Sequence, residues 1–321
     1  MKKTDVVALG ELLIDFTENG TSAQGNPLFE ANPGGAPCNV LAMLAKLGHE
    51  TAFIGKVGKD FFGTQLKDAI REVGICADHL LMDEEIHTTL ALVHTFPDGD
   101  RDFSFYRNPG ADMMLTEQEV PEELIANSGI FHFGTLSMTH EGVRAATKKA
   151  LDIAKKNNVT ISFDPNLRPP LWNSLEEAKE QVLYGLQYCD ILKISDNEIQ
   201  WLTGEADFTK GVARIKEINN KIRLILVSMG KDGSRAYYGD TMVEVAARIN
   251  ENTIETTGAG DTFCGCVLHY ILEHGLDDLT QENLMEMLKF ANSAASLITT
   301  KKGALRVMPE EKEILENMSG R

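Results

Sequence analysis

The sequence predicts an α/β protein with a mainly parallel central sheet and a small second β-sheet that forms a lid. Short apolar runs of strand character alternate with helical segments over most of the chain, which is typical of parallel strands joined by right-handed crossovers. Between residues 88 and 107 this alternation stops, and two strand-like runs flank the turn PDGD at residues 97–100. Such a pattern predicts an antiparallel hairpin outside the parallel sheet. The length of 321 residues suits one core with an appendage.

Composition limits the classes of partner and the compartment. A formal net charge of -17 argues against nucleic acid or an anionic membrane surface as a partner. The first apolar run is interrupted by Glu11 and Asp15, so neither a signal segment nor a membrane span is expected. The five scattered cysteines favour reduced thiols and a cytoplasmic location. Cys264 and Cys266 lack an accompanying His or Cys cluster, and we expect no zinc site there.

The first third of the chain reads as strand, helix, strand and helix. We expect strands over residues 6–10 and 51–55, because both runs are short, apolar and rich in β-branched or aromatic residues. Residues 40–48 have helical character and end at Gly48, a suitable C-cap. A second helix is expected from Asp60 to about residue 74. This succession implies parallel pairing of the two strands.

A glycine pair precedes the first helix in the run NPGGAPCN at residues 32–39. Gly34 and Gly35 allow a ligand to come close to the backbone. Asn39 falls in the first helical turn, where it either faces that ligand or simply serves as a polar residue at the helix start. Asp15 lies at the end of the first apolar run and is either a surface residue or a carboxylate with a partner or a function.

The predicted lid joins the hairpin to the segment before the glycine pair. Its residues are 15–35 and 88–111, and the core consists of residues 1–14, 36–87 and 112–321. Arg107 ends the hairpin, where it either reaches a substrate hydroxyl or phosphate or is a surface residue. Closure of the lid would exclude water from the site. The apolar strands of the lid also suggest the interface of a homodimer.

The second half of the chain returns to alternating strands and helices. Further strands are expected over residues 130–134, 159–164, 191–195 and 224–228, with an edge hairpin near residues 237 and 243. Polar residues follow the strand at 159–164 at the edge where α/β proteins bind ligands; they are Asp164, Asn166 and Arg168. After the strand that ends at Ser228, Gly230 and Gly233 mark a close approach of a ligand to the backbone. Glu198 begins the helix after residue 195, as a magnesium-side carboxylate or as a first-turn acid. His132 is expected to pack in the core rather than to act in catalysis.

The run TTGAGD at residues 256–261 is followed by an apolar helical segment. Two glycines in a tight turn before a helix create an anion cradle, because successive N–H groups point into a concavity at the positive end of the helix dipole. Asp261 is the first carboxylate able to face that cradle, which suggests that it holds or deprotonates a hydroxyl near a phosphate. The alternative is an ordinary glycine turn in which Asp261 caps the helix.

Several motifs together resemble the ribokinase-like (PfkB) carbohydrate kinases. TTGAGD at 256–261 is similar to their C-terminal signature, GGAPCN at 34–39 to their N-terminal signature, and GKDFFG at 58–63 matches between the two. The order and spacing agree along nearly the whole chain. YRNPGAD at 106–112, FDPNLR at 163–168 and LKISDNE at 192–198 resemble the fructokinase branch.

The resemblance implies a three-layer ribokinase-like fold and ATP-dependent phosphorylation of a sugar hydroxyl, with D-fructose to fructose 6-phosphate favoured. It implies that Asp261 is the catalytic base and that the anion hole is formed by the N–H groups of Gly258, Ala259, Gly260 and Asp261. The residues implied for the sugar are Asp15, Gly34, Gly35, Asn39, Arg107 and Arg168. Those implied for the nucleotide are Lys193, Ser195, Ser228, Gly230, Gly233 and Asn292. The implied ions are Mg²⁺, held by Glu198 largely through water, and K⁺ at Glu255 and Thr257.

Two positions depart from the family pattern. Ser195 stands where the family usually has Asn, and its shorter side chain weakens a direct phosphate contact. Glu255 stands where the family usually has Asp, and the extra methylene moves the carboxylate by about 1.5 Å. The helix N-terminus is expected to depress the pKa of Asp261. Asp261 would then be a weak base that orients the hydroxyl and accepts its proton late.

Other readings of the sequence remain open at this point. The same chemistry could act on 2-keto-3-deoxygluconate, ribose or a nucleoside, and Arg107 and Arg168 could serve a carboxylate as well as a hydroxyl. A catalytically silent sugar- or nucleotide-binding regulator is a further alternative, against which the intact Asp261 and both glycine signatures argue. A Rossmann dehydrogenase and a Walker-A ATPase are excluded, because neither G-x-G-x-x-G after the first strand nor G-x-x-x-x-G-K-[ST] occurs.

Overall fold

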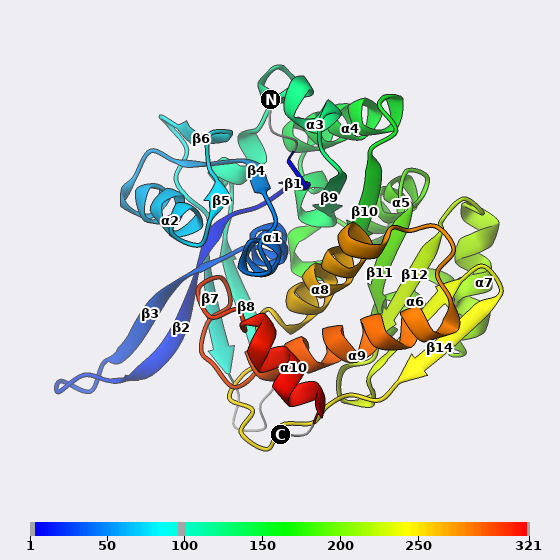
Figure 1. Ribbon diagram of the computed structural model, residues 1–321. Coiled ribbons are helices and arrows are strands. Elements are labelled where there is room, and N and C mark those ends of the chain that lie inside the picture. Colours follow the sequence, from blue (N-terminus) through cyan, green and yellow to red (C-terminus); the bar gives the residue numbers. More distant parts are fainter. Residues whose placement is uncertain (1–3, 96–100, 320–321) are drawn as a thin grey trace.

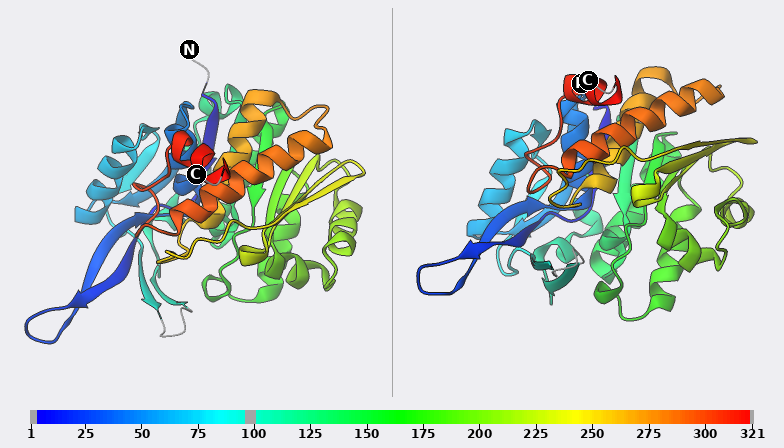
Figure 2. Two further views of the ribbon diagram at one scale, coloured as in Figure 1. Left: turned by 60° about the horizontal axis from the view of Figure 1, so that its bottom comes forward. Right: turned by 90° about the horizontal axis from the view of Figure 1, so that it is seen from below.

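A ten-stranded sheet crosses the molecule, with helices on both of its faces (Figures 1 and 2). The structure, a computed structural model, describes residues 4–95 and 101–319, so the turn expected at residues 97–100 lies outside the described residues. The strands of this sheet are β1 (Val6–Leu9), β4 (Thr51–Gly58), β5 (Ile75–Cys76), β6 (Leu80–Asp83), β9 (Ile130–Gly134), β10 (Thr160–Asp164), β11 (Ile191–Ser195), β12 (Leu224–Ser228), β13 (Ser234–Tyr238) and β14 (Thr241–Val245).

The order of the large sheet is β14-β13-β12-β11-β10-β9-β1-β4-β5, and β6 pairs with β4 beside this path. Every pairing is parallel except those of β13 with β12 and with β14. The predicted mainly parallel sheet and its antiparallel edge hairpin are therefore confirmed. The carboxyl ends of the parallel strands share one edge, where binding residues of such sheets gather.

Alternation along β1 divides the buried apolar residues into two layers. Val6 and Ala8 belong to one cluster, and Val7 and Leu9 to the other. The first layer contains α1 (Ala36–Lys46), α2 (Phe61–Glu72), α8 (Ala259–His274), α9 (Gln281–Ile298) and α10 (Glu311–Ser319). The second contains α3 (Glu122–Ala126), α4 (Glu141–Lys156), α5 (Leu175–Leu186), α6 (Asp196–Thr203) and α7 (Phe208–Ile218). Short 3-10 turns occur at η1 (Ala111–Met114), η2 (Glu117–Glu119), η3 (Thr135–Met138), η4 (Pro169–Leu171) and η5 (Gly230–Asp232).

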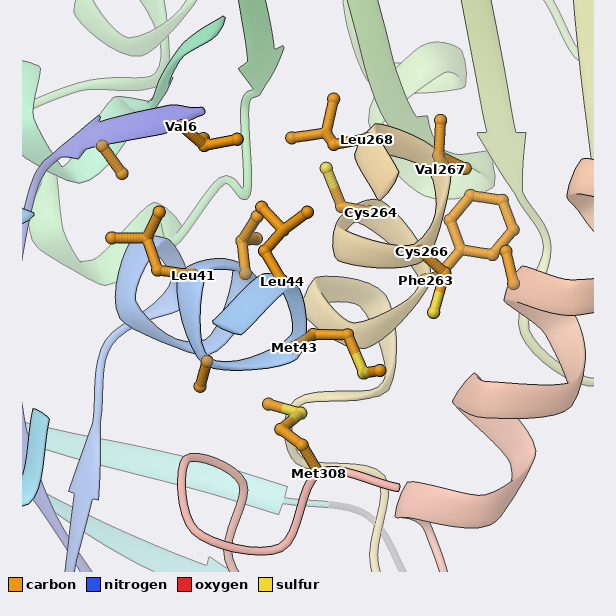
Figure 3. Close-up of a cluster of buried hydrophobic side chains, with 14 of the residues drawn as sticks. Val6, Leu41, Met43, Leu44, Phe263, Cys264, Cys266, Val267, Leu268 and Met308 are labelled. Carbon is orange, nitrogen blue, oxygen red and sulfur yellow. The ribbon is translucent and has the colours of Figure 1, made fainter. Parts of the chain in front are cut away.

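Helices α1 and α8 lie side by side in the first layer, and Figure 3 shows the apolar side chains between them. Leu44 and Met43 of α1 face Cys264 and neighbouring residues of α8. Both thiols of α8, Cys264 and Cys266, are buried in this cluster, so they act as small apolar side chains. The packing fixes the two helices relative to each other, and with them the residues at their first turns.

A separate four-stranded sheet projects from the core (Figure 1). Its strands are β2 (Leu13–Thr21), β3 (Pro27–Gly34), β7 (Leu90–Thr95) and β8 (Arg101–Tyr106), in the order β3-β2-β7-β8. The antiparallel pairing of β7 with β8 confirms the predicted hairpin, and β2 joins β7 in parallel. Strand β2 begins two residues before the expected start of the lid at residue 15. The division of the chain into core and lid stays a prediction.

Among the helices in the described part of the chain, none has both the length and the apolar character needed to span a membrane.

Candidate active site

A cavity of about 310 Å³ lies where the first turns of α1 and α8 meet the base of the small sheet. Four of the residues expected at the sugar line it, namely Asp15, Gly35, Asn39 and Arg168. The backbone of the predicted anion cradle lines it as well, together with Asp261. Segments from both ends of the chain are thus brought together at the carboxyl edge of the large sheet.

Gly34 lies behind the cavity lining rather than in it. A Cβ at Gly34 would collide with the carboxylate of Asp15, to which Gly34 is adjacent across the β2–β3 pairing. Glycine is therefore needed here so that the Asp15 side chain can occupy this place. The sequence placed Gly34 at the ligand, whereas the structure places it behind a residue that lines the cavity.

Arg107 is buried inside the protein, so it is not the surface residue that the sequence allowed, and its contact with a substrate stays a prediction. Its side chain is 4% exposed, and its Nε donates to Oδ2 of Asp112 at 2.8 Å. The two other guanidinium nitrogens donate to Oγ1 of Thr139 at 2.8 Å and to the carbonyl of Leu136 at 3.0 Å. A buried guanidinium needs a charged partner, and Asp112 supplies it from η1. Arg107 thereby fixes Leu136, which does line the cavity.

Asp261 is in the first turn of α8, directly after a tight glycine turn. Gly258 has a φ of 75°, and a Cβ there would lie 2.6 Å from Cβ of Ala304, so only glycine fits. Oδ2 of Asp261 accepts a hydrogen bond of 2.8 Å from Nδ2 of Asn39 in α1. Oδ1 of Asn39 is buried and has no hydrogen-bond partner in the described part of the protein. Because Asn39 lines the cavity, this oxygen can accept a hydrogen bond from a ligand hydroxyl.

The pKa of Asp261 shifts in the direction opposite to the one expected. Burial raises it, and the hydrogen bond from Asn39 and the positive charges of Lys193 and Arg168 oppose that shift without cancelling it. The sequence revealed the helix N-terminus but not the depth of burial, and desolvation is the larger effect. A raised pKa makes Asp261 a better proton acceptor than the sequence suggested.

Lys193 is buried and lies among the carboxylates of Asp164, Glu198 and Asp261, of which only Asp164 is fully buried. Its Nζ is 3.0 Å from Oδ2 of Asp164, and both side chains are almost fully buried. Burial raises the pKa of Asp164 to about 6, although Lys193 acts in the other direction. Burial would lower the pKa of Lys193, but the charges of Asp164 and Glu198 raise it overall. A Cβ on Gly260 would lie 3.2 Å from Nζ, so the ammonium group is adjacent to the anion cradle.

Glu198 and Ser195 bind each other at the start of α6. The backbone N–H and the hydroxyl of Ser195 each donate to Oε2 of Glu198 at 2.8 Å, and the N–H of Leu167 donates to Oε1 at 2.7 Å. The hydroxyl of Ser195 is thus used in a capping box. Glu198 also anchors the loop that carries Arg168. Carboxylates that already accept protein hydrogen bonds suit Mg²⁺ that keeps its water shell.

A second cavity, also of about 310 Å³, lies on the other side of the glycine turn. The residues expected at the nucleotide that line it are Ser228, Gly230, Gly233 and Asn292. Asn292 also holds neighbouring segments together. Its Oδ1 accepts a 2.9 Å hydrogen bond from the hydroxyl of Ser234, and its Nδ2 donates a 3.1 Å hydrogen bond to the carbonyl of Val245. Lys193 and Ser195 do not line this cavity. Thr256 and Gly260 line both cavities, so the anion cradle lies between them.

A family model described as pfkB family carbohydrate kinase matches residues 3–311 of this sequence. The chain belongs to this family of carbohydrate kinases. Fructokinase-1 of Zea mays is 40% identical over 313 residues, which cover 97% of this chain and 96% of that protein. A fructokinase with bound ATP from Xylella fastidiosa is 29% identical, covers 99% of both chains and has a TM-score of 0.89. A fructokinase from Vibrio cholerae O395 with fructose, ADP and calcium ion bound is 28% identical, covers 98% of this chain and 99% of that one, and has a TM-score of 0.88.

Three charged residues that line the cavities of this pfkB kinase were not predicted from the sequence, namely Glu11 at the first cavity and Lys231 and Arg248 at the second. Glu11 lines the first cavity, is 4% exposed, and accepts a 2.9 Å hydrogen bond from the N–H of Ala36. Burial raises its pKa to about 7, although the hydrogen bonds lower it. The available signal was a carboxylate inside an apolar run, which the sequence analysis used only against a signal segment.

Several apolar residues that line the cavities were also not predicted; they are Phe105, Leu136, Ile249 and Phe263. Their types carry no functional signal, because any core segment contains them. His132, by contrast, is the expected core histidine of this kinase. It is buried, lies 3.0 Å from the hydroxyl of Ser162, and burial lowers its pKa to about 3.

The segment expected at a potassium ion belongs to the same glycine turn of this kinase. Oε1 of Glu255 accepts a 2.7 Å hydrogen bond from the N–H of Gly303, and its own N–H donates to the carbonyl of Thr299. Thr257 lines the first cavity. The Glu255 carboxylate therefore lies against the loop that follows α9, where one of its oxygens accepts a hydrogen bond from Gly303.

Proposed function

We propose that this chain transfers the γ-phosphoryl group of ATP to the 6-hydroxyl of D-fructose. The observation that supports it most is the pair of cavities that meet at the glycine turn, with Asp261 on one side of that turn. Phosphoryl transfer requires two substrates aligned in line across an anion hole, and this arrangement provides one space for each. The fructokinase identity of the relatives supports fructose as the acceptor.

In the proposed reaction the sugar O6 attacks the γ-phosphorus while the bond to the ADP oxygen breaks. The proton of the hydroxyl moves to Asp261, whose pKa is raised by burial and whose orientation is fixed by Asn39. The N–H groups of the turn from Gly258 to Asp261 stabilise the charge that develops on the phosphoryl oxygens. Arg168 and Asp15 hold the other sugar hydroxyls, since both line the sugar-side cavity.

The proposed nucleotide position is the second cavity. Its lining by Ile249, Phe263 and Ala295 suits the flat faces of a base, and Ser228, Gly230 and Gly233 offer backbone and hydroxyl groups for polar atoms. The ammonium group of Lys193 is next to Gly260, where it would balance phosphate charge. We propose Lys193 for the phosphates rather than for the base.

Mg²⁺ fits the carboxylates beside Lys193. Glu198 and Asp164 would hold it largely through water, and it would neutralise charge on the phosphates. Glu255 and Thr257 would hold K⁺ through carboxylate and hydroxyl oxygens, and the hydrogen bond from the N–H of Gly303 to Oε1 of Glu255 fixes this carboxylate at the glycine turn. Both ions can be tested by their removal, with turnover as the readout.

A homodimer through the lid and a cytoplasmic location complete the proposal. Leu28 and Phe29 of β3 are 47% and 44% exposed, which leaves apolar surface on the small sheet. All five cysteines are free, which supports a reducing compartment. A monomer mass that does not change with protein concentration would contradict the dimer.

The deciding experiment is ADP release with MgATP, coupled to a detection enzyme, on a panel of acceptors. The panel is fructose, 2-keto-3-deoxygluconate, ribose and adenosine, each with and without K⁺. We expect turnover on fructose and formation of the 6-phosphate. Turnover confined to the keto acid would assign Arg168 to a carboxylate and overturn fructose as substrate. The absence of turnover on every acceptor would favour the binding regulator.

A further inference from the structure

Three side chains with metal-ligating atoms meet at the end of the molecule opposite the glycine turn. Nε2 of His49 lies 2.7 Å from Nδ1 of His269 and 4.0 Å from Oε1 of Glu273. Each of the three offers one ligand atom, and these atoms all lie within 4.8 Å of one another. Across the described ranges, this is the one group of three or more His, Cys, Asp or Glu residues with such spacing.

The fold itself brings the three ligands together. His269 and Glu273 are four residues apart on α8, so they share one face of the helix. His49 follows α1 directly after Gly48, whose φ of 90° turns the chain back, and its N–H donates to the carbonyl of Leu44. From Asp261 to His269 the helix rises by about 12 Å, so the group is remote from the proposed reaction centre.

The location favours a cation. Helices α1 and α8 lie side by side, and the hydrogen bond between Asn39 and Asp261 shows that both begin at the catalytic end (Figure 3). Both helices therefore direct their carboxyl ends toward the three ligands. The unpaired carbonyl groups at a helix end carry partial negative charge, and two such ends act together here.

A fourth residue orients the first ligand. Oδ2 of Asp5 lies 3.7 Å from Nδ1 of His49 and accepts a 2.9 Å hydrogen bond from the N–H of Glu50. A carboxylate behind a histidine favours the proton on the near nitrogen and leaves the lone pair on the far one. The lone pair of Nε2 then points to His269 and Glu273. Metal-binding histidines are commonly supported in this way.

The histidine pair needs either a proton or a metal ion between its rings. At 2.7 Å the two nitrogens must share one proton, because two lone pairs would repel each other. A tetrahedral ion at about 2.0 Å from each nitrogen would separate them to about 3.3 Å. Glu273 is largely exposed, so it can move to close the site.

We propose that His49, His269 and Glu273 bind a divalent transition metal of the zinc class, with Asp5 as the orienting carboxylate and water as the fourth ligand. Two imidazoles and one carboxylate match the ligand preferences of Zn²⁺ and Co²⁺ rather than those of Mg²⁺ or Ca²⁺. The metal ties the segment between α1 and β4 to the end of α8, and its role is to stabilise the fold. The site uses neither Cys264 nor Cys266, around which the sequence predicted no zinc.

The test is titration of the full chain with Zn²⁺ in the presence of excess Mg²⁺, followed by isothermal calorimetry. We expect one site that His269→Gln and Glu273→Gln each weaken by about 100-fold, and that Asp5→Asn weakens by about 10-fold or more. His87→Gln is the matched control, since His87 also lies near a carboxylate, Asp60, but outside the group. This control should leave the affinity unchanged.

A second measurement separates this site from others that take up zinc. Co²⁺ bound by these ligands should give a visible absorption band that His269→Gln abolishes, and Zn²⁺ should raise the Tm of the wild type but not of Glu273→Gln. Glu273 is exposed, so its substitution leaves the folded core intact. Equal Zn²⁺ affinity and stoichiometry in the wild type and in both variants would overturn the proposal, as would the absence of any zinc binding.

Discussion

The two cavities that meet at the glycine turn have the same volume but opposite character. The sugar-side cavity contains four ionisable groups, Glu11, Asp15, Arg168 and Asp261, which come from segments spread over most of the sequence. The nucleotide-side cavity is lined by residues between 228 and 299, and most of its exposed lining is contributed by apolar atoms. The nucleotide-side cavity is lined by two cations, Lys231 and Arg248, and by no acidic residue of the described chain. The difference indicates that carboxylates are concentrated on one side of the turn, and cations beside a flat apolar surface on the other.

The substitution with the largest expected effect tests whether the catalytic base lies in the sugar-side cavity. Asp261→Asn keeps a hydrogen-bond partner for Asn39 but cannot accept a proton, so kcat should fall by about 1,000-fold. The KM values for fructose and for ATP should change little, because the geometry is kept. Steady-state kinetics of the variant measures this. Asp68→Asn, on the exposed face of α2, is the matched control, and near-native turnover of Asp261→Asn would refute the role of Asp261 as base.

A second substitution tests whether the arginine of the sugar side recognises the acceptor. Arg168→Gln removes a charged donor from the cavity lining, and a charged hydrogen bond contributes about 2 kcal/mol, so the KM for fructose should rise by about 30-fold. The KM for ATP should stay within about twofold if the two cavities bind their ligands independently. Arg306→Gln is a surface control. Equal increases in the KM values for fructose and for ATP would contradict the assignment of Arg168 to the sugar alone.

The buried charge of Glu11 should also make the stability of the protein depend on pH. Its folded pKa of about 7 lies above the ordinary value of 4.5, so the folded state keeps a proton that the unfolded state releases between these values. Stability should therefore fall as pH rises through this window. From about pH 5 to about pH 8 the wild type should lose about 2 kcal/mol relative to Glu11→Gln, in which Gln still accepts from Ala36. Urea unfolding at both pH values measures this, and parallel pH profiles of the two proteins would contradict it.

The smallest effect concerns the nucleotide side. Ala295→Leu adds three carbon atoms to the lining of the second cavity, and crowding of this size costs about 1 to 2 kcal/mol. The KM for ATP should rise by about tenfold while that for fructose stays the same. Ala206→Leu, at an exposed position, controls for added bulk. A larger change in the KM for fructose than in that for ATP would show that the second cavity is not the nucleotide site.

Local patterns carried most of the fold prediction. The alternation of strands and helices and the hairpin at residues 88–107 are short-range signals, and the structure contains both. The parallel pairing of β2 with β7 was not predicted, because it joins segments about seventy residues apart and no local pattern encodes a partner. The contribution of Ile249 to the second cavity was also not predicted, because it lies in an irregular segment whose sequence has neither helical nor strand periodicity.

Site prediction failed where the outcome depends on surroundings rather than on residue type. Arg107 stands at a strand end from which it could reach a ligand, but Asp112 and Leu136 hold it inside. The pKa of Asp261 was expected to fall, because the helix start is visible in the sequence and the burial of the carboxylate is not. Asp15, Asn39 and Arg168 do line the cavity, since glycine turns and strand ends determine their positions, and their contact with a sugar stays a prediction.

The hydrogen bond between Asn39 and Asp261 joins residues that are 222 positions apart. During translation Asn39 is made first, and Asp261 is added 222 positions later. Helix α8 must then pack against α1, which was synthesised more than 200 residues earlier. Contacts this distant in sequence are slow to form, because closing so large a loop costs conformational entropy before the new contacts stabilise the structure. A nascent or truncated chain that lacks Asp261 therefore has no reaction centre.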